Sequence, residues 1–126
     1  METNGKRILV VEDDRFLRRA CEASLRQRGF TVLTAVDGEE GLRLVRAETP
    51  DLILLDLLMP KVTGLDVLRT IKAAEGTRDI PVLILSNSSR DQDVREVMNL
   101  GAVGYLVKAN LSLQELGDRV TQLLEG

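Results

Sequence analysis

The chain has 126 residues and a formal net charge of −3, from 17 basic and 20 acidic side chains. This length is typical of one domain, and we expect a single domain over residues 1–126, with its core at about 6–124 and no second domain. The acidic balance disfavours direct binding to nucleic acid, which usually requires a basic face. No apolar run reaches the length of a membrane span and the N-terminus lacks a signal-peptide pattern, so we expect a cytoplasmic location.

Cysteine and histidine content excludes several kinds of site. The chain contains one cysteine, Cys21, so it cannot form an internal disulfide. We expect Cys21 to be a small buried hydrophobe on the inner face of a helix. No histidine is present. Metal sites, catalytic triads and phosphorelay steps that need an imidazole in this chain are therefore excluded.

Apolar strands alternate with amphipathic helices along the first half of the chain. Residues 7–11 and residues 31–35 each predict a strand. Gly29 ends the helix between them, and Asp37 is expected to cap a helix after the second strand. The residues at helical spacing in the first helix are Phe16, Leu17, Ala20, Cys21, Ser24 and Leu25, and those in the second are Gly41, Leu42 and Val45.

The stretch from Leu52 to Pro60 is apolar except for one carboxylate, Asp56. A short, continuously apolar run bounded by Pro50 and Pro60 predicts a buried parallel strand. Because an isolated carboxylate inside a core is costly, we expect Asp56 at the carboxyl end of this strand, where open parallel sheets bind ligands. A helix N-cap or a loop aspartate is the structural alternative.

Two further strands and three further helices complete the predicted elements. The strands are expected at 80–85, with Pro81 at the start where its missing N–H is tolerated, and at 103–107. The helices are expected from Gly64 to near Gly76, over 91–100, and at the end of the chain. The apolar residues that mark the first and last of these helices are Leu65, Leu68, Ile71, Leu113, Leu116, Val120 and Leu123.

Five strand-helix units in succession predict an α/β fold. Strands that alternate with helices indicate a parallel sheet that is covered on both faces. Right-handed crossovers limit the topology to a doubly wound sheet. The flavodoxin-like (βα)5 arrangement, with strand order 2-1-3-4-5, is the common solution for five strands.

Polar side chains are expected at the carboxyl ends of four of these strands. In chain order they are Glu12 and Asp13, Asp56, Ser86, and Lys108. The four strand ends are neighbours in the predicted order, so three acids, a hydroxyl and an amine converge at one edge of the sheet. Helix caps and surface charges are the structural alternative for each residue taken singly.

This combination of groups suits phosphoryl transfer. Close carboxylates repel one another, and Mg²⁺, which accepts a few carboxylates and keeps several waters, relieves that repulsion. Asp56 can act as the nucleophile, as carboxylates do in aspartyl-phosphate chemistry. The metal and Lys108 would hold charge on the phosphoryl oxygens, and Ser86 would donate a hydrogen bond to one of them.

Other phosphate sites fit the sequence poorly. Gly5-Lys6 precedes the first strand, and no glycine-rich loop that ends in Lys-Ser or Lys-Thr follows it, so a P-loop is excluded. The acids after the first strand would repel a flavin or dinucleotide phosphate, and the GxGxxG pattern is missing. A phosphatase with an aspartyl nucleophile commonly carries a second Asp two residues on, where this chain has Leu58.

These residues also match the ordered motifs of a known family. The matching segments are Ile8-Leu9-Val10-Val11-Glu12-Asp13-Asp14, Asp56-Leu57-Leu58-Met59-Pro60 with Gly64, Ser86, and Gly104-Tyr105-Leu106-Val107-Lys108. With them the chain resembles, from Lys6 to about Leu124, the receiver domain of two-component response regulators, including the chemotaxis regulators.

The resemblance implies a signalling switch that is not an enzyme in the usual sense. Asp56 would accept a phosphoryl group from a sensor histidine kinase or a histidine phosphotransfer protein, through self-catalysed uptake followed by slow autodephosphorylation. Glu12 and Asp13 would bind Mg²⁺ or Mn²⁺ together with Asp56 and the backbone carbonyl of Leu58.

The resemblance also implies how the signal leaves the site. Ser86 and Lys108 would contact the phosphoryl group, and Tyr105 would be the aromatic switch residue that turns inward when the Ser86 hydroxyl moves. A half-buried strand residue is the structural alternative for Tyr105. The added charge of about −1.5 to −2 is expected to shift the face formed by 91–100, 103–107 and the last helix.

The expected partners on this face are a downstream protein target or a fused output domain. Val94, Val97 and Met98 are candidate contact residues, although some of them must belong to the core. A phosphorylation-linked homodimer is compatible with this interpretation.

Three positions depart from the family pattern. Ala109 follows the lysine where a proline with a cis peptide is usual, and we expect a trans bond because a cis bond before a non-proline residue costs about 2.5–4 kcal/mol. Leu58 places an aliphatic group beside the phosphoryl site, where it is expected to hinder water and lengthen the phosphoryl lifetime. Asn87 stands where a smaller residue is common and is expected to narrow the entrance to Asp56.

Two other functions remain open at this point. Ala109 favours an interaction module that keeps the fold but is not phosphorylated, whereas the complete acidic set argues against it. A Mg²⁺-dependent phosphohydrolase is disfavoured by Leu58 in place of a second Asp and by the lack of histidine.

Overall fold

Five parallel strands pair in the order β2-β1-β3-β4-β5 in a computed structural model, which describes residues 5–59 and 62–125. This order confirms the predicted doubly wound, flavodoxin-like α/β fold. Pro60, expected to bound the central apolar stretch, and the first four residues lie outside the described part of the chain. The elements are β1 (Arg7–Val11), α1 (Arg15–Gln27), β2 (Thr31–Ala35), α2 (Gly38–Glu48), β3 (Leu52–Asp56), α3 (Gly64–Ala73), β4 (Val82–Ser86), α4 (Asp91–Asn99), β5 (Gly104–Val107), η1 (Lys108–Asn110, a 3₁₀ turn) and α5 (Leu113–Glu125).

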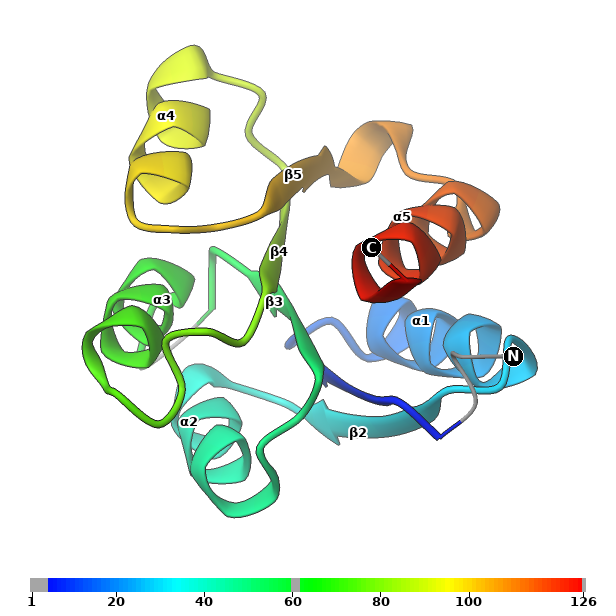
Figure 1. The fold of residues 1–126 in the computed structure, drawn as a ribbon. Helices are drawn as coiled ribbons and strands as arrows, with labels where there is room; N and C mark the ends of the chain where they lie inside the picture. Colours follow the sequence, from blue (N-terminus) through cyan, green and yellow to red (C-terminus); the bar gives the residue numbers. More distant parts are fainter. Residues whose placement is uncertain (1–4, 60–61, 126) are drawn as a thin grey trace.

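Helices cover both faces of the sheet, with α2, α3 and α4 on one side and α1 and α5 on the other (Figure 1). Residues of β1 alternate between the two layers: Leu9 and Val11 join the core cluster beneath α2 and α3, whereas Ile8 and Val10 join the cluster beneath α1 and α5. All five residues of β3 are buried, as expected for a strand in the middle of a covered sheet.

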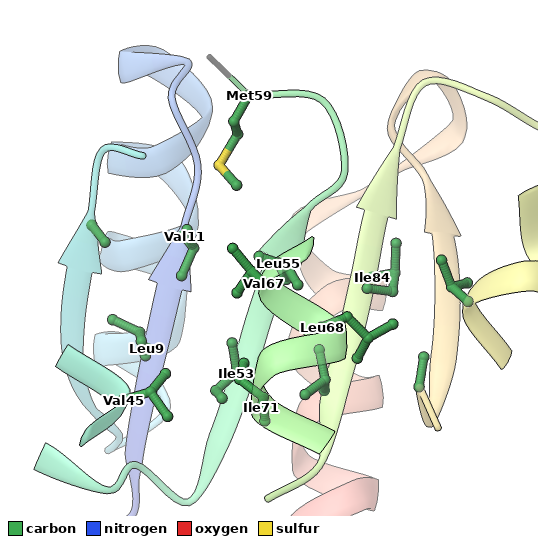
Figure 2. Packing of buried hydrophobic residues seen from close by; sticks show 14 residues of the cluster. Leu9, Val11, Val45, Ile53, Leu55, Met59, Val67, Leu68, Ile71 and Ile84 are labelled. Atoms are coloured by element: carbon green, nitrogen blue, oxygen red, sulfur yellow. The ribbon is translucent and has the colours of Figure 1, made fainter. Parts of the chain in front are cut away.

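Helix α3 packs directly over the central strands (Figure 2). Its fully buried residues Val67, Leu68 and Ile71 lie against the strand residues Ile53, Leu55 and Ile84. This apolar layer fixes the position of β3, and with it the position of Asp56 at the end of the strand. Cys21 is buried on the opposite layer, as predicted.

Side chains of loop residues cap the N-termini of four helices, and Ser112 caps α5 by accepting a hydrogen bond from the N–H of Glu115. The carboxylate of Asp14 accepts hydrogen bonds from the N–H groups of Phe16 and Leu17, and the carboxylate of Asp37 accepts one from Glu40, which confirms Asp37 as a cap. Thr63 caps α3. Asp56 is therefore not the cap of the helix that follows it, which removes the helix N-cap alternative.

Two apolar residues of the predicted helical patterns are exposed. Phe16, the first residue of the pattern in the first helix, is 86% exposed in the first turn of α1. Leu113 is 39% exposed at the first position of α5. Apolar spacing predicts which side of a helix faces the sheet, but it does not predict where the sheet ends.

Several element boundaries also differ from the predicted ones. β4 begins at Val82, since Pro81 has no N–H to contribute to a ladder, and it extends to Ser86. β5 begins at Gly104 and α3 ends at Ala73, both within a few residues of the prediction. Within the described ranges, no helix is long and apolar enough to cross a membrane.

Candidate functional site

Three carboxylates meet at the carboxyl edge of the central strands. Glu12 directly follows β1 and Asp56 ends β3, and the pairing of Val11 with Leu55 places these two strand ends side by side. One carboxylate oxygen from each of Glu12, Asp13 and Asp56 lies within 4.8 Å of the others. Glu12 and Asp56 are buried, whereas Asp13 is exposed. The predicted acidic cluster therefore forms.

Lys108 reaches this cluster from the end of β5. Its Nζ atom lies 2.9 Å from Glu12 Oε1 and 3.1 Å from Asp56 Oδ1. The backbone holds the two buried acids as well: Glu12 Oε2 accepts a hydrogen bond of 3.0 Å from Asp14 N, and Asp56 Oδ1 accepts one of 3.2 Å from Leu58 N. The predicted amine thus joins two of the three predicted acids.

The charges of this cluster do not balance. Burial and the nearby Glu12 carboxylate raise the pKa of Asp56 to about 7, although Lys108 acts in the opposite direction. Burial opposes the charge of Lys108, but its bonds to Glu12 and Asp56 outweigh that effect and raise its pKa. Among the described residues, the ammonium group that contacts these acids is that of Lys108, and it reaches Glu12 and Asp56. A proton or a cation is therefore needed to compensate the excess negative charge of the three carboxylates.

The donor set fits a hard divalent cation. Asp56 Oδ2 is buried, and no described residue donates a hydrogen bond to it. An ionised oxygen without a partner in such a position is costly unless a cation or a reacting group occupies the space before it. Grouped carboxylate oxygens are the ligands that Mg²⁺ prefers.

A cavity of about 540 Å³ opens beside the cluster, between the loop after β3 and the first turns of α4. Ser86, Asn87 and Leu58 line it together with apolar residues such as Leu65. Ser86 is buried, but Leu58 is 69% exposed, so an aliphatic side chain stands at the mouth of the cavity. The hydroxyl oxygen of Ser86 accepts a hydrogen bond of 3.1 Å from Ser88 N.

Tyr105 is half-buried on β5 and packs against the core cluster beneath α2 and α3. Its hydroxyl donates a hydrogen bond of 2.8 Å to the backbone carbonyl of Ser88. The backbone of Ser88 thus bonds to both Tyr105 and Ser86, and the sequence analysis did not select this residue. The Ser88-Ser89 pair after the fourth strand was the available signal, but its contacts depend on the conformation of the loop.

Arg18 is a second residue that the sequence analysis missed. Its Nη1 atom donates to the backbone carbonyl of Glu12 at 2.9 Å and to that of Asp13 at 3.4 Å. The guanidinium group therefore ties the first turns of α1 to the acidic turn. An arginine one helical turn beyond an acidic pair was the only signal in the sequence.

The peptide bond between Lys108 and Ala109 is trans, because none of the peptide bonds in the described ranges is cis. This confirms the predicted isomer. The trans bond does not displace the lysine, whose amine still reaches both buried acids. Alanine in place of proline therefore leaves the cluster intact.

Comparison with known proteins gives a consistent family. Residues 8–121 match the family described as the response regulator receiver domain. The probable transcriptional regulator ycf27 of Cyanophora paradoxa is 40% identical over 124 residues, which cover 98% of this chain and 50% of that protein. The transcriptional regulatory protein PrrA of Mycobacterium tuberculosis is 42% identical over 118 residues, with coverages of 94% and 49%. The chain spans about half the length of these curated relatives.

Solved structures show the same fold. The receiver domain of the Francisella response regulator 1452 superposes with a TM-score of 0.89 at 28% identity, covering 96% of this chain and 98% of that domain. The chemotaxis protein CheY4 of Vibrio cholerae, crystallised at low pH, gives a TM-score of 0.89 at 27% identity, with coverages of 95% and 99%. Together with the five-stranded order and the acidic edge, these matches show that the chain belongs to the family of response regulator receiver domains.

Proposed function

We propose that this chain is a phosphorylation-dependent switch that works in the cytoplasm as part of a two-component system, with Asp56 as the phosphoacceptor. The observation that carries the proposal is the buried Asp56 carboxylate, which contacts Lys108 and lies in a cluster with Glu12 and Asp13. A buried acid held against a lysine and two further acids has a perturbed pKa, and such groups are concentrated at functional sites.

The phosphoryl group comes from a phosphohistidine of a sensor kinase or phosphotransfer protein, or from a small acyl phosphate. One carboxylate oxygen of Asp56 attacks the phosphorus atom and forms the new P–O bond. The bond from phosphorus to the donor's nitrogen or oxygen breaks, and the leaving group takes the electron pair. Lys108 places its ammonium beside the phosphoryl oxygens, and the Ser86 hydroxyl donates to one of them.

The carboxylates of Glu12, Asp13 and Asp56 would hold Mg²⁺ or Mn²⁺, together with the backbone carbonyl of Leu58. The ion supplies positive charge against the phosphoryl oxygens. The residues of the chain prepare the site for it: Arg18 fixes the acidic turn through the backbone carbonyls of Glu12 and Asp13.

Phosphorylation changes the face formed by α4, β5 and α5, and this face contacts the partner. Tyr105 lies on this face and bonds to the loop that follows Ser86, so a change at Ser86 has a short path to α4. Met98 of α4 and Val103 before β5 are exposed there, whereas Val97 belongs to the core. The relatives are named transcriptional regulators, and we propose that this face controls a protein target, a fused output domain or a second copy of the chain.

The alternative of an unphosphorylated interaction module has lost its main support. It depended on Ala109, but the trans bond at Ala109 leaves Lys108 in contact with Asp56. Phosphoryl acceptance therefore accounts for the cluster better than an interaction role alone.

Intact mass spectrometry after incubation with acetyl phosphate and Mg²⁺ tests the proposal. We expect a gain of one phosphoryl group in the unmutated protein, no gain in Asp56→Asn, and little gain when a chelator removes the metal. Asp51→Asn serves as the matched control, since Asp51 precedes the same strand at its opposite end. An equal gain in Asp56→Asn, or no gain in any sample, would refute Asp56 as the acceptor.

A further inference from the structure

Ser88, in the loop between β4 and α4, connects three parts of the molecule. Its backbone N–H donates to the hydroxyl oxygen of Ser86 at 3.1 Å, and its carbonyl accepts from the hydroxyl of Tyr105 at 2.8 Å. Its own hydroxyl donates to Asp93 Oδ2 in the first turn of α4. One residue therefore contacts the phosphoryl-contacting serine, the strand β5 and the helix α4.

The first turn of α4 holds Ser88 in this position. Arg90 is the N-cap residue of α4, but its side chain accepts no hydrogen bond from the backbone N–H groups of the helix. Instead its Nε and Nη2 atoms donate to the two carboxylate oxygens of Asp93, at 3.1 and 3.2 Å, and its N–H donates to Ser88 Oγ at 3.2 Å. The Asp93 carboxylate thus accepts hydrogen bonds from the Ser88 hydroxyl and from two nitrogen atoms of the Arg90 guanidinium. A guanidinium that donates to both carboxylate oxygens fixes the orientation of the carboxylate as well as its distance.

Building on the function proposed above, we infer that Asp93 is a positioning residue: through Ser88 it holds the Ser86 hydroxyl for phosphoryl contact and the Tyr105 hydroxyl against the loop. The Ser88 N–H occupies a lone pair of Ser86 Oγ, which leaves the hydroxyl hydrogen free to donate to a phosphoryl oxygen. Small errors in the placement of such donors reduce reaction rates.

The ionisation of Asp93 supports this role. Its hydrogen bonds with Ser88 and Arg90 hold the pKa of Asp93 below its ordinary value. Near neutral pH the carboxylate is therefore charged, and hydrogen bonds to a charged acceptor are stronger than those between neutral groups.

A simple helix-dipole effect is the competing explanation. Any acid in the first turn of α4 stabilises the helix through the partial positive charge at its N-terminus. Asp91 provides the matched control, because it lies in the same turn, is exposed and carries the same charge. Asp93→Ala and Asp91→Ala remove the same charge, but only the first removes the acceptor of the Ser88 hydroxyl.

Two measurements separate these explanations. The first is the rate constant for phosphoryl uptake from acetyl phosphate. The second is acrylamide quenching of tyrosine fluorescence, which reports on Tyr105 alone because the chain has one tyrosine and no tryptophan. Thermal unfolding of both variants shows how much helix stability each one loses.

We expect Asp93→Ala to lower the uptake rate constant about three- to tenfold, the effect of losing one hydrogen bond, and to increase the quenching of Tyr105. Ser88→Ala should reproduce both effects, since it removes the same contact. Asp93→Asn, which keeps an acceptor for the Ser88 hydroxyl, should restore part of the rate. Asp91→Ala should change neither quantity.

The inference is overturned if Asp93→Ala and Asp91→Ala behave alike, or if uptake slows while the quenching of Tyr105 stays unchanged. If the unmutated protein takes up no phosphoryl group, the proposed function fails. The quenching measurement on the unphosphorylated protein then still decides whether Asp93 positions Ser88 and Tyr105.

Discussion

At the scale of single residues, the burial of the Asp56 carboxylate has a cost in folding free energy. Asp56 is 2% exposed at the end of a fully buried strand, and it faces Glu12 as well as Lys108. Keeping such an acid ionised opposes folding, because its charge is removed from water and placed beside another carboxylate. The same conditions leave its Oδ2 atom without a hydrogen-bond donor among the described residues, so this oxygen is available for a cation or a phosphorus atom.

This cost predicts that Asp56→Asn stabilises the metal-free protein, and that the gain depends on pH. The folded-state pKa of Asp56 is raised from 3.8 to about 7. Between these values the folded state binds the proton more tightly than the unfolded state, so the stability of the unmutated protein falls as the pH rises through this window. At pH 8 we expect the variant to be more stable by about 1–4 kcal/mol, and near pH 4 by much less.

Urea unfolding of both proteins at pH 4, 6 and 8, with a chelator present, measures this difference. A gain that is independent of pH would show that Asp56 is not held ionised at a cost. Added Mg²⁺ should reduce the stability advantage of Asp56→Asn at pH 8, because a bound cation stabilises the folded, ionised form of the unmutated protein.

Leu58 predicts a property of the phosphorylated protein. It is 69% exposed at the mouth of the cavity that Ser86 and Asn87 also line. An aliphatic group there offers no hydrogen bond to an attacking water. We expect Leu58→Asn to speed the loss of the phosphoryl group about three- to tenfold, the effect of one hydrogen bond.

The decay of the phosphorylated mass after removal of the donor gives the rate constant directly. Met98→Asn is the control, because Met98 is also an exposed apolar residue but lies on α4 and does not line the cavity. Equal decay in Leu58→Asn and the unmutated protein would remove the proposed role of Leu58.

At the scale of elements, the site depends on how closely α3 approaches the end of β3. The N–H of Gly64 donates to the carbonyl of Leu57 at 2.9 Å. A Cβ atom on Gly64 would lie 2.2 Å from the carbonyl oxygen of Asp56 and 2.5 Å from Leu57 Cα. The helix can therefore start where it does only because residue 64 has no side chain.

Gly64→Ala should push the start of α3 away from the strand that carries Asp56. Overpacking against backbone typically costs about 1–3 kcal/mol, and we expect a loss of this size together with weaker Mg²⁺ binding. Gly76→Ala is the control, since a Cβ there meets nothing within 4 Å. Chemical denaturation and Mg²⁺ titration measure the two effects, and the prediction fails if both variants match the unmutated protein.

The elements also show what the sequence could and could not predict. The apolar stretch 52–60 predicted both the central strand and the place of Asp56, because a buried strand leaves few positions for a carboxylate. The exposure of Phe16 could not be predicted, because it depends on the length of the strands beneath α1. The role of Ser88 depends on the conformation of a loop, which apolar periodicity does not describe.

At the scale of the whole molecule, one sheet carries both the acidic cluster, at the end of β3, and the face formed by α4, β5 and α5. Asp56 lies on β3 and Tyr105 on β5, with β4 between them (Figure 1). The loop after β4 contacts both the site, through Ser86, and β5, through Tyr105. Since the chain spans about half the length of its curated relatives, we propose that this face acts on the rest of a longer protein or on a separate partner.

Two-dimensional ¹H–¹⁵N NMR with acetyl phosphate and Mg²⁺ tests the switch most directly. The account predicts chemical-shift changes around Asp56 and, in addition, along residues 88–107, which include Ser88, α4 and Tyr105. Asp56→Asn under the same conditions should show only the changes caused by Mg²⁺. Phosphorylation confirmed by mass, with changes confined to the neighbourhood of Asp56, would contradict the account, because the phosphoryl group would then be bound without any effect on the α4–β5–α5 face.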